Sequence, residues 1–280
     1  MSLATPSLAP QTPAGADDCW RVGDVTLTSR FLLGTARYPS PHILREAMCV
    51  SGSQIVTVGL KRQMAAGAGD NAFIDIIRQA LAKTDARLLP NTAGCASARE
   101  AVQLAHMARE LYGTPWIKLE VIGDDYTLQP DPQELVRAAA ELAREGFTVF
   151  PYCTDDLVTC KRLLDAGCPL LMPWGAPIGS GQGLTNPFAL RLLRERLPDT
   201  VLIIDAGMGA PSHAAQAMEM GFDAVLLNSA ISYSPDPVRM AGAFRQAIEA
   251  GRAAYRAGIM AKQDFAVPST PVTGSPFLIG

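Results

Sequence analysis

Lys118 stands inside the apolar stretch WIKLEVI, where a charged side chain is unusual. Because successive side chains of a β-strand point to opposite faces, Ile117, Leu119 and Val121 would share one face. Lys118 and Glu120 would share the other, with their ammonium and carboxylate groups roughly 6–7 Å apart along the strand. Burial lowers the pKa of a lysine, and the free amine is a nucleophile toward carbonyl carbon. The spacing is therefore consistent with amine chemistry on a carbonyl substrate.

The same two residues are also consistent with a purely structural role. Lys118 and Glu120 would then form an internal ion pair that fills one layer of a protein core. The other four lysines of the chain lie in polar or helical surroundings, so Lys118 is the one lysine that raises this question. Spacing alone leaves both interpretations open.

Glycine-rich segments later in the chain indicate a second kind of site. The stretch PIGSGQG at 177–183 carries three glycines in five residues, GMG follows at 207–209, and Asn228-Ser229 ends a later apolar run. Glycines let backbone N–H groups approach an anion closely. Consecutive loops of this kind predict a phosphate site, although tight turns without a ligand are the alternative. Asp205, just before the second segment, is either a second carboxylate of the site or a cap for the turn.

The elements that must position these residues alternate regularly along the chain. Eight short apolar runs are each followed by a helical pattern, at residues 30–33, 55–59, 87–90, 116–120, 148–152, 170–172, 201–205 and 224–227. This alternation predicts an α/β fold, a (β/α)8 TIM barrel, whose active site lies at the carboxyl ends of the strands. A doubly wound sheet uses the same alternation, but eight units in about 250 residues favour closure.

The chain is expected to form a single barrel domain with irregular ends. Residues 1–20 are interpreted as a disordered, flexible leader, 21–258 as the barrel and 259–280 as an irregular C-terminal tail. Residues 25–27 are a candidate for a small additional strand. Four helices are expected to start at a capping side chain followed by proline, namely at Ser40-Pro41, Asp131-Pro132, Asn186-Pro187 and Asp236-Pro237.

Composition narrows the classes of function. A hydrophobic content of 48% lets 280 residues bury a large core, and a net charge of −3 argues against a nucleic-acid or anionic-membrane partner. No apolar run reaches the length of a membrane span. Six cysteines without C-x-x-C spacing are typical of reduced thiols in a cytoplasmic protein. The three histidines are too scattered to suggest a metal site.

Four collinear motifs resemble those of one enzyme family, the thiazole synthases of bacterial thiamine biosynthesis. The motifs are NTAGC at 91–95, IKLEVIG at 117–123, PIGSGQG at 177–183 and IDAGMG at 204–209. The resemblance runs from about Phe31 to Gly258 and leaves the leader outside. It implies a barrel enzyme that builds thiazole phosphate carboxylate from 1-deoxy-D-xylulose 5-phosphate, dehydroglycine (2-iminoacetate) and sulfur.

The resemblance also assigns roles to residues of this chain. Lys118 corresponds to the family lysine that forms a Schiff base with the ketose, and Glu120 and Asp205 to carboxylates that transfer protons. The implied phosphosugar-binding positions are Gly179, Ala206, Gly207, Asn228 and Ser229. Two departures are visible: Trp174 stands where a smaller residue is expected and would narrow the mouth or stack on a substrate, and Ser229 replaces a threonine while keeping the hydroxyl.

The expected partners follow from the same resemblance. Sulfur would arrive as a thiocarboxylate on the C-terminus of a ubiquitin-like carrier protein, and the enzyme would be a homotetramer or another homo-oligomer in the cytoplasm. Neither a metal ion nor an organic cofactor is implied. Two alternatives use the same residues: a class I aldolase-like lyase acting on a phosphosugar, and a non-enzymatic sugar-phosphate-binding protein.

Overall fold

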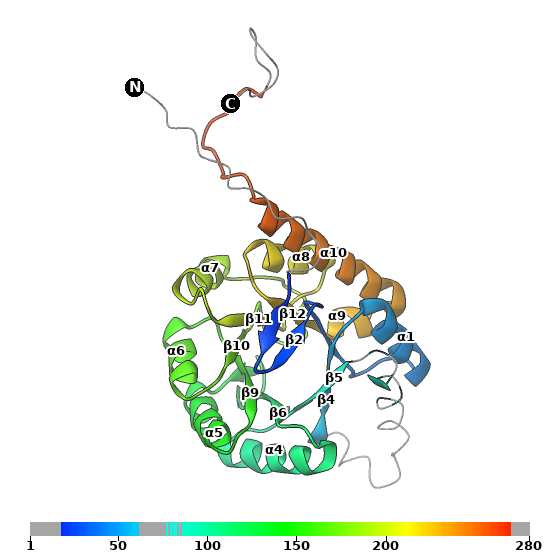
Figure 1. Cartoon of the computed structure of the whole chain (residues 1–280), viewed down its shortest axis with the longest axis vertical. Coiled ribbons are helices and arrows are strands. Elements are labelled where there is room, and N and C mark those ends of the chain that lie inside the picture. The colour runs from blue at the N-terminus through cyan, green and yellow to red at the C-terminus, as the bar shows by residue number, and fades with distance from the viewer. Residues whose placement is uncertain are drawn as a thin grey trace.

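The computed structural model describes residues 18–61, 77, 79, 81, 82, 84 and 86–269. Eight parallel strands close into a barrel with helices around it (Figure 1). The barrel strands are β3 (Phe31–Gly34), β4 (Ile55–Gly59), β5 (Arg87–Asn91), β6 (Trp116–Leu119), β9 (Thr148–Cys153), β10 (Leu170–Pro173), β11 (Val201–Asp205) and β12 (Ala224–Leu227). The predicted (β/α)8 barrel is confirmed, and each predicted strand is present to within one residue at either end.

Around the barrel the strands follow the order β10, β11, β12, β3, β4, β5, β6 and β9, and β9 pairs with β10 to close it. The helices of the described chain are α1 (Pro41–Ser51), α4 (Ala98–Tyr112), α5 (Pro132–Arg144), α6 (Leu157–Asp165), α7 (Pro187–Arg196), α8 (Pro211–Glu219), α9 (Ser229–Ser232) and α10 (Pro237–Ala257). The four predicted caps are confirmed. Each capping side chain accepts a hydrogen bond from a backbone N–H of the first turn, and proline follows it. Within the described residues, no helix is both long enough and apolar enough to span a membrane.

The two faces of β6 separate as the sequence predicts. Ile117, Leu119 and Val121 belong to the apolar layer between the barrel and its helices. Trp116 belongs instead to a second cluster inside the barrel, together with Phe150. Parallel strands that are buried on both sides read as nearly continuous apolar runs, which is why the strand positions were visible in the sequence.

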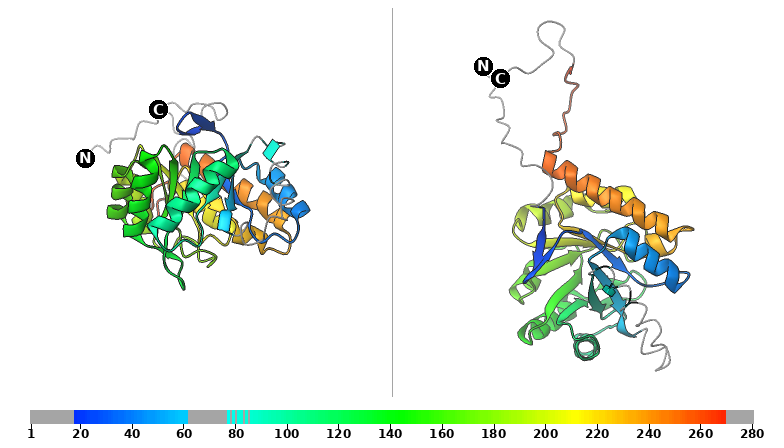
Figure 2. Two further views of the ribbon diagram at one scale, coloured as in Figure 1. Left: turned by 90° about the horizontal axis from the view of Figure 1, so that it is seen from below. Right: turned by 45° about the vertical axis from the view of Figure 1, so that its right-hand side comes forward.

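A β-hairpin at one end of the barrel extends the interior cluster. It consists of β1 (Trp20–Val22) and β2 (Val25–Leu27), and it lies across the end of the barrel (Figure 2). Trp20, Val22 and Leu27 are buried in the same cluster as the interior barrel residues. The hairpin therefore closes the end opposite the carboxyl ends of the strands. The additional strand predicted at 25–27 is present, whereas β1 was not predicted.

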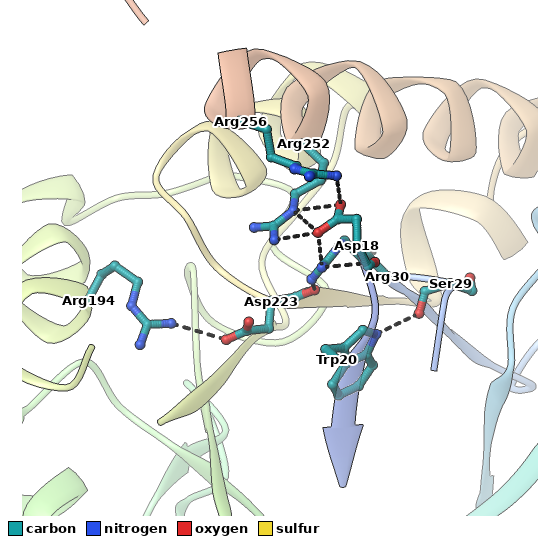
Figure 3. Close-up of polar contacts among 8 residues, drawn as sticks. All are labelled: Asp18, Trp20, Ser29, Arg30, Arg194, Asp223, Arg252 and Arg256. Carbon is teal, nitrogen blue, oxygen red and sulfur yellow. Dashed lines mark hydrogen bonds and ion pairs between the residues drawn. The ribbon is translucent and has the colours of Figure 1, made fainter. Parts of the chain in front are cut away.

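Asp18, which lies just before this hairpin, forms ion pairs with arginines of the last helix (Figure 3). Its carboxylate lies 2.8 Å from Arg30 and 2.7 Å from Arg252, with Arg256 at 3.9 Å. Partial burial alone would raise the pKa of Asp18, but hydrogen bonds and charge from Arg252 and Arg30 outweigh it and lower that pKa to about 2. Asp18 and Trp20 fall in the segment that the sequence assigns to the leader. Residues 1–17 lie outside the described residues.

Two further segments complete the described chain. A short antiparallel pair, β7 (Ile122–Asp124) and β8 (Gln129–Pro130), follows β6 at the carboxyl end of the barrel and was not predicted. Residues 258–269 after α10 form neither helix nor strand and are exposed. The remainder of the predicted tail, 270–280, lies outside the described residues.

Candidate active site

A cavity of about 640 Å³ opens at the carboxyl ends of the barrel strands. This volume is within the range of small-molecule sites. All eight residues predicted for the site line it: Lys118, Glu120, Gly179, Asp205, Ala206, Gly207, Asn228 and Ser229. The fold therefore brings the predicted amine, both carboxylates and the glycine loops to one place.

Lys118 lies between two buried carboxylates. Its Nζ donates a hydrogen bond to Glu120 Oε1 at 2.6 Å and lies 2.7 Å from Asp205 Oδ2. The contact with Asp205 is a close ion pair. All three residues are at most 5% exposed. The pair of residues expected from spacing is thus a triad with a formal charge of −1.

The third member reaches the lysine from a distant strand. Asp205 ends β11, which is three strands away from β6 around the barrel. Thr92, which is fully buried, holds the end of β6 in place: its hydroxyl donates to the Glu120 carbonyl and accepts from the Glu120 N–H, both at 2.8 Å. The threonine of the NTAGC motif therefore positions the backbone that carries Glu120.

Electrostatics of the triad correct one expectation. Burial alone would lower the pKa of Lys118, but the charges of Asp205 and Glu120 outweigh it and raise that pKa above its ordinary value. The predicted depression of the lysine pKa is therefore wrong, and Lys118 rests as an ammonium. Burial, reinforced by the charge of Glu120, raises the pKa of Asp205 despite the opposing Lys118. The raised pKa makes Asp205 a carboxylate that can hold a proton received from Nζ.

Two aromatic residues, Tyr152 and Trp174, lie near the triad without lining the cavity. Tyr152 is fully buried, and its ring centroid lies 5.3 Å from Lys118 Nζ, close enough for a cation–π contact. Burial raises the pKa of Tyr152, which keeps its phenol neutral. Trp174 is not among the residues that line the cavity, and its ring N–H donates to Asp155 Oδ1 at 3.2 Å. The suggestion that Trp174 stacks on a substrate therefore has no support from the geometry.

The glycine loops pack tightly against one another. Gly183 N–H donates to the Gly207 carbonyl at 2.8 Å. Gly207 has φ of +79°, and a Cβ there would lie 2.3 Å from Ala176 N. Loop packing alone therefore explains glycine at 207. Gly179 is different: its φ is +75°, but a Cβ there would meet only Ser229 Oγ, at 3.9 Å. The space beside Gly179 is where an anion could approach the backbone.

Two more features mark the lining of this region. Ala206 adopts a left-handed φ of +68°, a strained conformation for a residue other than glycine that recurs at functional sites. Asn228 Oδ1 is buried and accepts no hydrogen bond within the described residues. An acceptor of this kind at a cavity wall is available to a ligand hydroxyl or N–H.

Lys61 also lines the cavity, although the sequence placed it only in polar surroundings. It follows β4 by two residues, so its position at the carboxyl end of a predicted strand was a signal that could have found it. No cluster of three or more metal-ligating side chains was found among the described residues. The six cysteines are free thiols.

This protein is a closed (β/α)8 barrel with a cavity at the carboxyl ends of its strands and a buried lysine in that cavity. TIM-barrel enzymes have their active sites at this place. Residues 21–271 match the family model described as thiazole biosynthesis protein ThiG. The chain is 61% identical to a thiazole synthase of Nitrobacter winogradskyi over 91% of this chain and 96% of that one. A thiazole synthase of Coxiella burnetii is 58% identical over 93% and 98% of the two chains. The chain belongs to the ThiG family of thiazole synthases.

A solved structure gives a third comparison. BexX in the Amycolatopsis orientalis BexX/CysO complex is similar to this chain with a TM-score of 0.79 and 30% identity, over 89% of this chain and 100% of that one. Family membership makes this protein a sulfur-incorporating enzyme of thiamine biosynthesis.

Proposed function

We propose that this thiazole synthase joins 1-deoxy-D-xylulose 5-phosphate, dehydroglycine and sulfur through an imine on Lys118. The observation that carries the proposal is the triad, in which Nζ lies 2.6 Å and 2.7 Å from two carboxylates in a cavity shared with the glycine loops. An amine nucleophile needs a nearby group to accept its proton. Buried carboxylates at these distances meet that need.

The proposed sequence of steps begins with proton transfer from Nζ to Asp205, whose pKa is raised by burial. The free amine adds to the ketone carbon, and the carbinolamine loses water as a carboxylic acid of the triad returns the proton to the leaving oxygen. The resulting iminium is an electron sink, so a carboxylate of the triad can remove a proton from the adjacent carbon. Glu120 and Asp205 are the groups proposed for these proton transfers.

The phosphosugar is proposed to lie along the glycine loops. Its phosphate would approach Gly179, where the backbone is open, and the neighbouring positions Ala206, Gly207 and Ser229. Asn228 Oδ1 would accept a hydrogen bond from a hydroxyl of the sugar, because it accepts none from the described residues of the protein. In this proposed arrangement the ketone would lie beside Lys118.

Sulfur is proposed to arrive as the thiocarboxylate of a ubiquitin-like carrier protein. The relative BexX was solved in complex with a second protein, CysO, which supports a protein partner for this chain. A homo-oligomeric assembly and a cytoplasmic location are further expectations from the family. The proposed steps use only side chains of this chain and the three inputs.

Imine trapping tests the proposal. The protein is incubated with the ketose phosphate and borohydride, digested, and analysed by mass spectrometry. A reduced sugar adduct on Lys118 is expected, and Lys118→Met should carry none. Absence of an adduct on intact, active protein, or an adduct only on another lysine, would overturn the imine. Product formation that requires the thiocarboxylated carrier separates this reaction from that of an aldolase-like lyase.

A further inference from the structure

The cavity contains a second cationic side chain whose role is unassigned. Lys61 Nζ donates a hydrogen bond to the Gly94 carbonyl at 2.5 Å and lies 3.4 Å from Glu100 Oε2. Its side chain is 44% exposed, in contrast to the buried Lys118. The lysine therefore stands at the rim of the cavity, within reach of solvent and of ligands.

Charge balance singles out this lysine. The charged side chains among the described lining residues are Lys61, Lys118, Glu120 and Asp205. Lys118 is already held between the two carboxylates. A ligand carboxylate that enters the cavity is repelled by Glu120 and Asp205, so it needs a cation away from the triad. In the described lining, Lys61 is the cation that remains.

The strand order gives the cavity a direction. From β10 the barrel continues through β9, β6 and β5 to β4, so β6 lies two strands from both β10 and β4. The loop with Gly179 follows β10, Lys118 stands on β6, and Lys61 follows β4. The loop with Gly179 and the loop with Lys61 therefore lie on opposite sides of the barrel mouth, and the strand that carries Lys118 lies midway between them.

We propose that Lys61 binds the carboxylate of the two-carbon imino acid that is joined to the ketose. This inference rests on the proposed function, in which the ketose phosphate occupies the side of the glycine loops. The second substrate must then approach Lys118 from the side of the barrel mouth that faces the glycine loops. Lys61 stands on that side and would bind its carboxylate. Lys61 is thus a specificity-determining residue for a small carboxylate.

The present partners of Lys61 do not prevent this exchange. The pair with Glu100 is exposed, and such pairs contribute little to stability. Glu100 keeps a second donor, because the Ala96 N–H also donates to Oε2, at 3.2 Å. Lys61 can therefore turn to a ligand without leaving a buried charge unpaired.

Steady-state kinetics of three variants test the proposal. Glyoxylate with an ammonium salt supplies the imino acid, with ketose phosphate and thiocarboxylated carrier saturating. Lys61→Met is expected to raise the apparent KM for glyoxylate roughly tenfold, the loss of one hydrogen bond between charged groups at a partly exposed site. Lys61→Arg should recover most of the affinity, and the matched control Glu100→Gln should stay within about twofold of wild type.

Two further measurements make the outcome decisive. Borohydride trapping of the ketose phosphate on Lys118 should be unchanged in Lys61→Met, because that step needs no carboxylate. Oxamate, a stable planar carboxylate, should bind roughly tenfold more weakly to Lys61→Met in calorimetry, which tests Lys61 even if the wild type traps no imine. An unchanged KM and oxamate affinity, a loss of trapping, or a change confined to the carrier's KM would each overturn the assignment.

Discussion

Replacing Lys118 by methionine is expected to do more than abolish imine formation. Methionine approximates the volume of the lysine stem, but it leaves Glu120 and Asp205 buried near one another without a counter-charge. Repulsion and burial then act together, so one of the two carboxylates takes up a proton in the folded state. Asp205 is the expected site, because burial already raises its pKa when Lys118 is present.

The magnitude follows from this buried triad. Removing one partner of a buried ion pair costs about 3–5 kcal/mol of unfolding free energy. Proton uptake limits the loss, because each extra proton bound by the folded state changes stability by about 1.4 kcal/mol per pH unit. Since the folded variant binds more protons than the unfolded chain above about pH 4, its stability falls as pH rises. We expect Lys118→Met to be about 2–3 kcal/mol less stable at pH 8 than at pH 5.5, relative to wild type.

Urea unfolding followed by circular dichroism at pH 5.5 and pH 8 measures this effect. The control is Lys118→Met combined with Asp205→Asn, which removes one of the opposed charges and should recover stability at pH 8. If Lys118→Met matches wild type at both pH values, the carboxylates do not depend on the lysine and the reasoning is refuted. Loss of stability in Lys118→Met is thus no argument against catalysis, because the triad predicts both effects.

Three other substitutions test the ion pairs of Asp18 and the packing of the glycine loops. Asp18→Asn should lower the unfolding free energy by about 2 kcal/mol at pH 7, from a pKa lowered to about 2. The wild type should lose this stabilisation as pH falls from about 4 toward 2, and urea unfolding at pH 7 and pH 3 measures the loss. Equal stability of wild type and Asp18→Asn at pH 7 would contradict this prediction. Gly207→Ala should cost several kcal/mol in thermal unfolding and raise the ketose phosphate concentration needed for trapping, because its Cβ would lie 2.3 Å from Ala176 N. Gly179→Ala should cost only about 1 kcal/mol of stability, from backbone strain at φ +75°. If Gly207→Ala and Gly179→Ala destabilise the protein equally, close packing does not distinguish the two glycines.

The fold was largely predictable because its signals are local. Barrel strands are continuous apolar runs between caps and glycine turns, so β4, β11 and β12 begin and end at the predicted residues. The strand β1 is three residues long, with only Trp20 and Val22 buried, which is too short for a period of two to be visible. The contacts that fix its place, burial against the barrel interior and the ion pair of Asp18 with Arg252, join residues far apart in the sequence.

The residues of the site were predictable, but of their contacts only the one between neighbours in a strand was. Lys118 and Glu120 share a strand face, and spacing alone brought them together. Asp205 reaches the same Nζ from three strands away, a contact that only closure of the barrel produces. That contact decides the sign of the lysine pKa shift, because burial acts against the charges of two carboxylates. The position of Lys118 in an apolar strand predicted its burial correctly, but spacing along the chain could not show that Asp205 contacts its Nζ.

A raised pKa for Lys118 is compatible with its proposed role as an amine. The resting ammonium and the iminium carry the same charge, so Glu120 and Asp205 stabilise both and the charge of the buried triad is unchanged by imine formation. Only the free amine between them is disfavoured. Asp205, 2.7 Å from Nζ and with a pKa raised by burial, can hold the proton for that interval. The lysine thus stays protected by its charge until a ketone lies beside it, and the carboxylates favour the iminium over the neutral intermediates that precede it.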